Sequence, residues 1–178
     1  ILRRTDATRL LLANTALRSI HNRHYLAERF AERGVDADRL ILEGPAEHFA
    51  YLEKYSRIDV ALDAFPYNGG TTTMEAIWQG VPVLSFAGDR WAGRTSQSLL
   101  HDTPLGAFVA DDVRRYVDRA VELARDAATP ARLADLRSHA RVSLQHSPAC
   151  NVRELARSME RLYRTAWSRA SRLLARGC

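Results

Sequence analysis

The sequence predicts an α/β fold, in which a Rossmann-like parallel sheet carries helices on both faces and is followed by terminal helices. Three observations predict it: short apolar runs alternate with helical segments through residue 110, the connections are rich in Gly, Pro and Asn, and only helical periodicity follows. Strands and helices that alternate at this spacing form parallel sheets with right-handed crossovers. We therefore expect one domain over residues 1–178, with a sheet region at 1–110 and C-terminal helices at 111–178.

The first half of the sheet region is predicted from apolar runs separated by helical spacing. Buried strands are expected at residues 10–13, 40–42 and 58–62. Helical spacing predicts one helix over residues 22–33 and another that begins at Pro45. Gly34 follows the first helix, at a place where a left-handed residue commonly ends a helix.

The second half begins with a loop at residues 66–70, whose Pro, Asn and Gly residues are typical of turns. A helix is expected over residues 71–79, with three possible capping threonines at its start and Gly80 at its end. The remaining elements expected are a strand at 81–86, a short helix at 95–100 and a last strand at 107–110.

Helix-start signals organise the residues after 110. Asp111 or Asp112 is expected to cap the first terminal helix, and Thr129-Pro130 and Ser147-Pro148 each resemble a cap followed by proline in the first turn. The last helix carries one apolar stripe at helical spacing, and we interpret this stripe as core packing. Its residues are Val152, Leu155, Met159, Leu162 and Ala166, flanked by Tyr163 and Trp167.

Composition excludes several classes of protein. Apolar residues make up 46% of the chain and charged residues 26%, as in globular domains, and no apolar run approaches the roughly 20 residues of a membrane span. Cys150 and Cys178 have no metal-type spacing and are expected to be free thiols. We therefore expect a soluble, cytoplasmic protein without a membrane association. Because residues 111–178 hold 14 Lys or Arg interleaved with 8 Asp or Glu, their basic character is expected to mark solvated helix faces rather than nucleic-acid binding.

The candidate site is the junction between the glycine loop and the helix at residue 71. Glycines let a backbone approach a ligand closely, and the first amides of a helix lack intrahelical partners, so Asn68, Gly69, Gly70, Thr71 and Thr72 can bind a phosphate or diphosphate. One turn later, the carboxylate of Glu75 can accept hydrogen bonds from a ribose diol. Phosphate and diol together indicate a nucleoside diphosphate. A glycine turn with ordinary threonine caps is the alternative, and no P-loop is present.

Other polar residues offer weaker candidates. His21 and His24 lie three residues apart without a third ligand nearby, so no metal site is predicted. Asp59 and Asp63 share a face of the predicted strand, and Asp63 is expected to have a structural role in which it interacts with loop amides.

The central segment resembles a known family. Residues 59–83 read DVALDAFPYNGGTTTMEAIWQGVPV and are similar to the signature of the bacterial and plant relatives of O-linked N-acetylglucosamine transferase. Gly88-Asp89-Arg90, Ser147-Pro148 and residues 163–167 follow the order of the family, so the resemblance covers most of the chain from about Leu10.

The resemblance implies an inverting, metal-independent glycosyltransferase of the two-lobed GT-B type, of which this chain would be the C-terminal, donor-binding lobe. It implies transfer of N-acetylglucosamine from UDP-N-acetylglucosamine to Ser or Thr of proteins, without a further cofactor. Thr71 and Thr72 would hold the UDP diphosphate and Glu75 the uridine ribose, Tyr51 would lie beside the uracil, and Lys54 would lie near the nucleotide. Tyr51 as a ring covering the sheet and Lys54 as a solvated side chain are the alternatives.

The sequence also departs from the family pattern. Gly70 stands where many members have His or Thr, and Asn151 stands where Asp is usual. The amino-terminal lobe, the helical repeats that bind acceptor proteins, the catalytic base, and the first strand of this lobe are expected outside the chain. That missing strand would have had the strands at Leu10 and Val81 as neighbours and should leave unpaired backbone groups on at least one edge. A UDP-glucose-dependent enzyme and a non-catalytic nucleotide-sugar or protein-binding module remain as alternatives.

Overall fold

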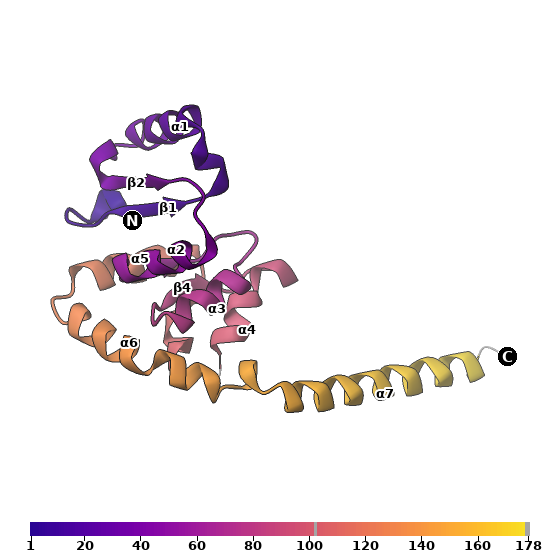
Figure 1. Ribbon diagram of the computed structural model, residues 1–178. Helices are drawn as coiled ribbons and strands as arrows, with labels where there is room; N and C mark the ends of the chain where they lie inside the picture. The colour runs from indigo at the N-terminus through magenta and orange to yellow at the C-terminus, as the bar shows by residue number, and fades with distance from the viewer. Residues whose placement is uncertain (102, 177–178) are drawn as a thin grey trace.

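A computed structural model describes residues 1–101 and 103–176 and confirms the α/β fold (Figure 1). In these residues the strands are β1 (Leu10–Ala13), β2 (Leu40–Glu43), β3 (Ala61–Leu62), β4 (Val83–Phe86) and β5 (Val109–Ala110). The α-helices are α1 (Ile20–Ala31), α2 (His48–Glu53), α3 (Thr71–Trp78), α4 (Thr95–Leu100), α5 (Val113–Arg125), α6 (Thr129–Gln145) and α7 (Val152–Arg176).

The strands form two separate parallel sheets. β1 pairs with β2, and β4 lies between β3 and β5. Within the described residues, the outer edges of β1 and β3 therefore have no partner strand, which confirms the expectation of unpaired edges. The expectation that the strand at residue 81 borders the break is wrong, because β4 is paired on both sides and the edge strands of its sheet are β3 and β5.

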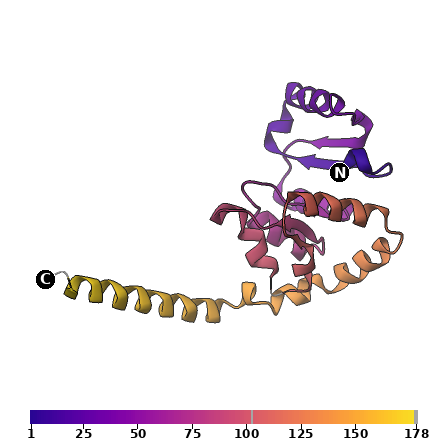
Figure 2. The same ribbon diagram turned by 180° about the vertical axis from the view of Figure 1, so that it is seen from behind.

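The hydrophobic core surrounds the three-stranded sheet. Ile77 of α3, Leu84 of β4 and Leu100 of α4 are completely buried, and Leu144 of α6 packs into the same cluster. By contrast, every residue of β1 and β2 is only partly buried, although seven of the eight are apolar, and α1 buries none of its residues. The core is thus built on β4, and the β1–β2–α1 unit stands apart from it in both views (Figures 1 and 2).

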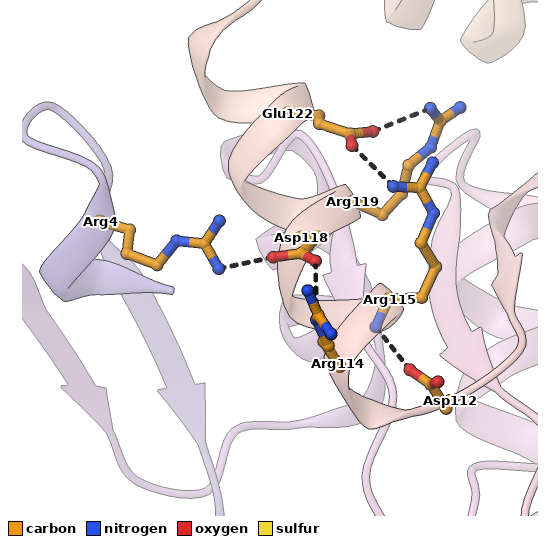
Figure 3. A network of polar contacts seen from close by, with 7 residues as sticks. All are labelled: Arg4, Asp112, Arg114, Arg115, Asp118, Arg119 and Glu122. Atoms are coloured by element: carbon orange, nitrogen blue, oxygen red, sulfur yellow. Dashed lines mark hydrogen bonds and ion pairs between the residues drawn. The ribbon is translucent and has the colours of Figure 1, made fainter.

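Ionic contacts connect the β1–β2–α1 unit to the rest of the chain. Arg4 pairs with Asp118 of α5 at 2.6 Å (Figure 3). Arg125 donates to the carbonyl oxygen of Arg4 at 2.6 Å. On the other side, Glu43 at the end of β2 pairs with Lys54 at 2.8 Å and with Arg57 at 2.6 Å.

Several elements are shorter than the sequence predicts. β3 begins at Ala61 rather than residue 58, because the N–H of Ile58 closes a turn with Tyr55 and its carbonyl accepts from Arg137 instead of a neighbouring strand. β4 begins at Val83, since the N–H of Val81 closes the end of α3 and Pro82 has no N–H to donate.

Two other boundaries also differ. β5 begins at Val109 rather than 107, because Thr103 and Pro104 start a 3₁₀ turn that continues to Phe108. The second predicted helix begins at His48 rather than Pro45, and a 3₁₀ turn at Lys54–Arg57 follows it.

Helix ends follow the sequence signals in part. Gly34 and Gly80 have positive φ angles of 71° and 79°, and Asp112 caps α5 by accepting from the N–H of Arg115 at 2.7 Å. Thr129 is not a cap, because it already lies inside α6 and Ala128 precedes it without a side-chain hydrogen bond. Pro148 starts a 3₁₀ turn, and α7 begins only at Val152, where Asn151 accepts from the N–H of Glu154 at 3.1 Å.

The apolar stripe of α7 is exposed, so the prediction that it packs into the core is wrong for the described residues. Figures 1 and 2 show α7 projecting from the body of the protein. Its exposed fractions are 61% for Leu155, 62% for Leu162 and 75% for Trp167. Cys150 is a free, half-buried thiol, as expected, whereas Cys178 lies outside the described residues.

Candidate functional site

The junction between the glycine loop and α3 has the predicted form. Gly70 is the N-cap residue of α3, and Thr71 is its first helical residue. No side chain caps the helix, and among the described residues no acceptor meets the N–H groups of Gly70, Thr71 or Thr72. These donors and the positive end of the helix dipole therefore remain available to an anion.

The loop before the junction is held from the sheet. The carboxylate of Asp63, directly after β3, accepts from the N–H of Gly69 at 2.8 Å through Oδ1 and from Ser85 Oγ of β4 at 2.6 Å through Oδ2. This contact confirms that Asp63 interacts with loop amides. The loop is also tied to its neighbours by the N–H of Asn68, which donates to the carbonyl of Ala92 at 2.8 Å.

A second set of contacts comes from α4. Ser96 Oγ donates to the carbonyl of Gly69 at 3.1 Å and lies 2.9 Å from Thr73 Oγ1. Ser96 and Thr73 are both buried. Gly69 is required here because a Cβ at this position would lie 2.6 Å from Thr73 Oγ1 and 2.7 Å from Thr72 Oγ1.

Asn68 carries the one buried side-chain nitrogen or oxygen without a hydrogen-bond partner in the described part of the chain. Its side chain is 2% exposed, and its amide nitrogen donates to the carbonyl of Ala64 at 3.0 Å, whereas Oδ1 has no partner. Buried polar atoms are almost always satisfied, so this acceptor, in a residue two positions before the N-cap of α3, is an exception.

Tyr51, Thr72 and Glu75 are brought together through Tyr55. The hydroxyls of Tyr51 and Tyr55 lie 3.4 Å apart, with their rings edge to face, and Tyr55 donates to the carbonyl of Thr72 at 3.2 Å. Burial raises the pKa of the Tyr55 hydroxyl well above its usual value, Tyr51 adds to the rise, and the charge of Glu75 contributes further. Glu75 itself is half-buried on α3.

Lys54 pairs with Glu43 at the end of β2. Its ammonium lies 2.8 Å from Glu43 and 3.5 Å from the carbonyl of Gly44, and its side chain is 14% exposed, so it is not the solvated lysine of the alternative interpretation. The hydrogen bonds from Lys54 and Arg57 hold the pKa of the Glu43 carboxyl below its usual value. Lys54 thus fixes the carboxyl end of β2 to the helix that carries Tyr51.

Sequence reasoning missed three residues that shape the site. Tyr55, Ser85 and Ser96 are not among the residues that the sequence singles out. Ser85 did carry a signal, because it is the single hydroxyl in an apolar strand and buried hydroxyls need partners. No local pattern identifies Ser96, whose partner Gly69 lies 27 residues away.

Other features lie outside this cluster. An open cavity of about 340 Å³ at the ends of β4 and β5 is lined by Ala87, Gln97, His101, Gly106, Val109, Ala110 and Asp111, none of them a predicted site residue. Across residues 1–101 and 103–176, no three His, Cys, Asp or Glu side chains gather as a metal ion would require. In the same residues, no helix combines the length and apolarity of a membrane span.

Comparison with known proteins relates both the fold and the site to one family. The sequence model of glycosyl transferase family 41 matches residues 16–159. A rice protein named as a probable UDP-N-acetylglucosamine–peptide N-acetylglucosaminyltransferase, SPINDLY, is 38% identical over 119 residues, which are 67% of this chain and 12% of the rice protein. The UDP-N-acetylglucosamine–peptide N-acetylglucosaminyltransferase of Caenorhabditis elegans is 30% identical over 138 residues, covering 78% of this chain and 12% of that protein.

A solved structure shows the same fold. A mutant of the Thermobaculum terrenum O-GlcNAc transferase matches with a TM-score of 0.80 and 37% identity over 91% of this chain. The match covers 31% of the Thermobaculum chain, so the present chain corresponds to a part of a larger molecule in each of these comparisons.

Proposed function

This chain belongs to glycosyl transferase family 41, and we infer that it supplies the donor-binding part of an inverting, metal-independent protein O-glycosyltransferase. The proposed reaction transfers N-acetylglucosamine from UDP-N-acetylglucosamine to Ser or Thr hydroxyls, in keeping with the names of the rice and nematode relatives. The chain spans about 12% of the length of those relatives. The activity of the whole enzyme, and the parts of it that lie outside this chain, are therefore also proposals.

The observation that carries the proposal is the open amino terminus of α3. The N–H groups of Gly70, Thr71 and Thr72 have no acceptor in the described residues. A diphosphate offers several anionic oxygens to such a row of amides, and the helix dipole favours their charge.

The remaining site residues would hold the nucleoside. Glu75 lies one turn along α3 from the diphosphate, where its carboxylate can accept hydrogen bonds from both hydroxyls of a ribose. Tyr51 contacts Tyr55, which donates to the carbonyl of Thr72 in the same turn, so the Tyr51 ring can lie beside the base. Lys54 can approach the nucleotide only by leaving Glu43, so we assign it an indirect role in holding the helix that carries Tyr51.

In the proposed mechanism, the acceptor hydroxyl oxygen forms a bond with the anomeric carbon while the bond from that carbon to the diphosphate oxygen breaks. The hydroxyl proton passes to a base outside this chain, and the bond electrons leave with UDP. The task of this chain is to stabilise the negative charge that grows on the leaving diphosphate. Preorganised amides act efficiently here because they need no reorientation at the transition state.

The proposed partners are a UDP-sugar donor, an acceptor protein, and an amino-terminal lobe with helical repeats in the same enzyme. We also propose a cytoplasmic location, as favoured by two cysteines without the spacing of a disulfide framework. Immunoblotting of cell fractions tests that location directly.

Isothermal titration calorimetry on the full-length enzyme tests the proposed function. UDP and UDP-N-acetylglucosamine should bind the wild type, and Glu75→Ala should weaken both. GDP and UDP-glucose serve as competitors that report base and sugar selectivity. Equal binding of UDP-glucose would favour the glucosyltransferase alternative, and the absence of heat with every nucleotide would favour a protein-interaction module.

A further inference from the structure

Gly69 is held at both ends by side chains from two different elements, the half-buried Asp63 and the buried Ser96. Its N–H donates to Asp63 Oδ1 at 2.8 Å, and its carbonyl accepts from Ser96 Oγ at 3.1 Å. The first contact comes from the end of β3 and the second from α4. Gly69 directly precedes the N-cap residue of α3, so these contacts act on the last peptide units before the open helix terminus.

The contact from Ser96 determines the direction of one open donor. A trans peptide is planar and points its C=O and the following N–H to opposite sides. Because the Gly69 carbonyl points at Ser96, the N–H of Gly70 in the same peptide points away from α4, where no described residue accepts from it. Ser96 thereby directs this N–H outward.

Each anchoring side chain is itself fixed. Ser96 Oγ lies 2.9 Å from Thr73 Oγ1, and since Ser96 gives its proton to Gly69, Thr73 is the donor of that pair. Asp63 is held through Oδ2 by Ser85 at 2.6 Å and through its carbonyl by Tyr116, whose hydroxyl donates at 3.2 Å. The anchors therefore form a rigid support.

We propose that Asp63 and Ser96 are positioning residues that clamp Gly69 and thereby aim the Gly70 N–H at the donor diphosphate. This inference rests on the proposed function, and it assigns a role to two residues that do not themselves contact the nucleotide. Its consequence is selective: the clamp affects the affinity for the diphosphate and leaves the affinity for the nucleoside unchanged.

The test compares Ser96→Ala with Ser98→Ala in the full-length enzyme. Ser98 lies on the same helix, is exposed and, among the described residues, donates to the carbonyl of Arg94 at 3.1 Å, so it is a matched control. The readouts are the inhibition constants of UDP and of uridine, the KM for UDP-N-acetylglucosamine and the melting temperature. For Ser96→Ala we expect the inhibition constant of UDP to rise about 10- to 150-fold, because a factor of this size corresponds to the loss of one hydrogen bond to a charged group. The inhibition constant of uridine should stay unchanged.

A second pair of variants covers the case in which Ser96→Ala unfolds. Asp63→Asn retains an oxygen that can accept from the Gly69 N–H, and its new NH₂ group can donate to the Ser85 hydroxyl. Asp63→Ala offers neither contact. Asp63→Asn should therefore retain UDP affinity that Asp63→Ala loses.

The outcomes separate the two hypotheses. Equal UDP affinity in Ser96→Ala and Ser98→Ala, equal losses for UDP and uridine, or equal losses in Asp63→Asn and Asp63→Ala would each overturn the clamp while the proposed function stands. A wild type that binds no UDP would refute the proposed function itself, and the clamp with it.

Discussion

Replacing Gly69 with alanine is the sharpest steric test of the loop geometry. The added Cβ would lie 2.6 Å from Thr73 Oγ1 and 2.7 Å from Thr72 Oγ1, well inside van der Waals contact. Overpacking of this kind costs about 1–3 kcal/mol. Thr73 can rotate away only by giving up its contact with Ser96 at 2.9 Å, which leaves buried hydroxyls unsatisfied at a similar cost of about 1–3 kcal/mol.

The expected result has a thermal and a binding part. At about 2–4 °C per kcal/mol for a domain of this size, Gly69→Ala should lower the melting temperature by about 2–12 °C in differential scanning calorimetry. Displacement of the first amides of α3 should weaken UDP binding about 10- to 150-fold for each lost hydrogen bond, measured by titration calorimetry.

Gly70→Ala is the matched thermal control. Its Cβ would meet only Thr95 Cγ2 at 3.8 Å, an ordinary contact, so the melting temperature should change by less than in Gly69→Ala. A Gly69→Ala protein that melts and binds UDP like the wild type would refute the close approach between Gly69 and the two threonines.

Three further predictions concern the surroundings of the site. Asn151→Ala should reduce amide protection in the first turn of α7, at a cost of about 0.5–2 kcal/mol, while Asn151→Asp retains the cap to Glu154; equal hydrogen exchange in both variants would contradict this. Lys54 lowers the pKa of Glu43, so the ion pair stabilises the folded state above the unfolded pKa of about 4.3. This stabilisation is lost as the pH falls below that value and Glu43 is protonated. Lys54→Met should therefore flatten the acid limb of a curve of unfolding free energy against pH. Because burial raises the pKa of Tyr55, its neutral hydroxyl contributes full stability below the unfolded pKa of about 10, and this contribution is lost as the pH rises above it. Tyr55→Phe should therefore make the alkaline limb of the unfolding free energy shallower in urea titrations. An unchanged limb would show that Tyr55 ionises freely.

Local signals in the sequence predicted the site better than the sheet. The helix start after Gly70 and the helix end at Gly80 were predictable because each depends on the backbone freedom of one or two residues. The extent of β3 was not, because the strand exists only where β4 supplies a partner, and the backbone of Ile58 forms its hydrogen bonds with Tyr55 and Arg137 instead.

Long-range contacts escaped prediction for the same physical reason. The pairing of Ser96 with Gly69 depends on how α4 packs against the loop, which no periodicity records. The stripe of α7 was recognised correctly as an apolar face, but periodicity identifies only the face and not the surface that covers it, and in the described residues it is exposed.

The division of the sheet has a consequence for how the protein opens. The β1–β2–α1 unit contributes no completely buried side chain from its strands or helix and is tied to α5 and α2 largely by ionic contacts, whereas β4 lies inside the core. Subglobal unfolding follows such differences in buried contact. The backbone amides of β1 and β2 should therefore exchange with deuterium through a partial opening that leaves β4 intact, and added salt should speed that exchange by weakening the ionic ties.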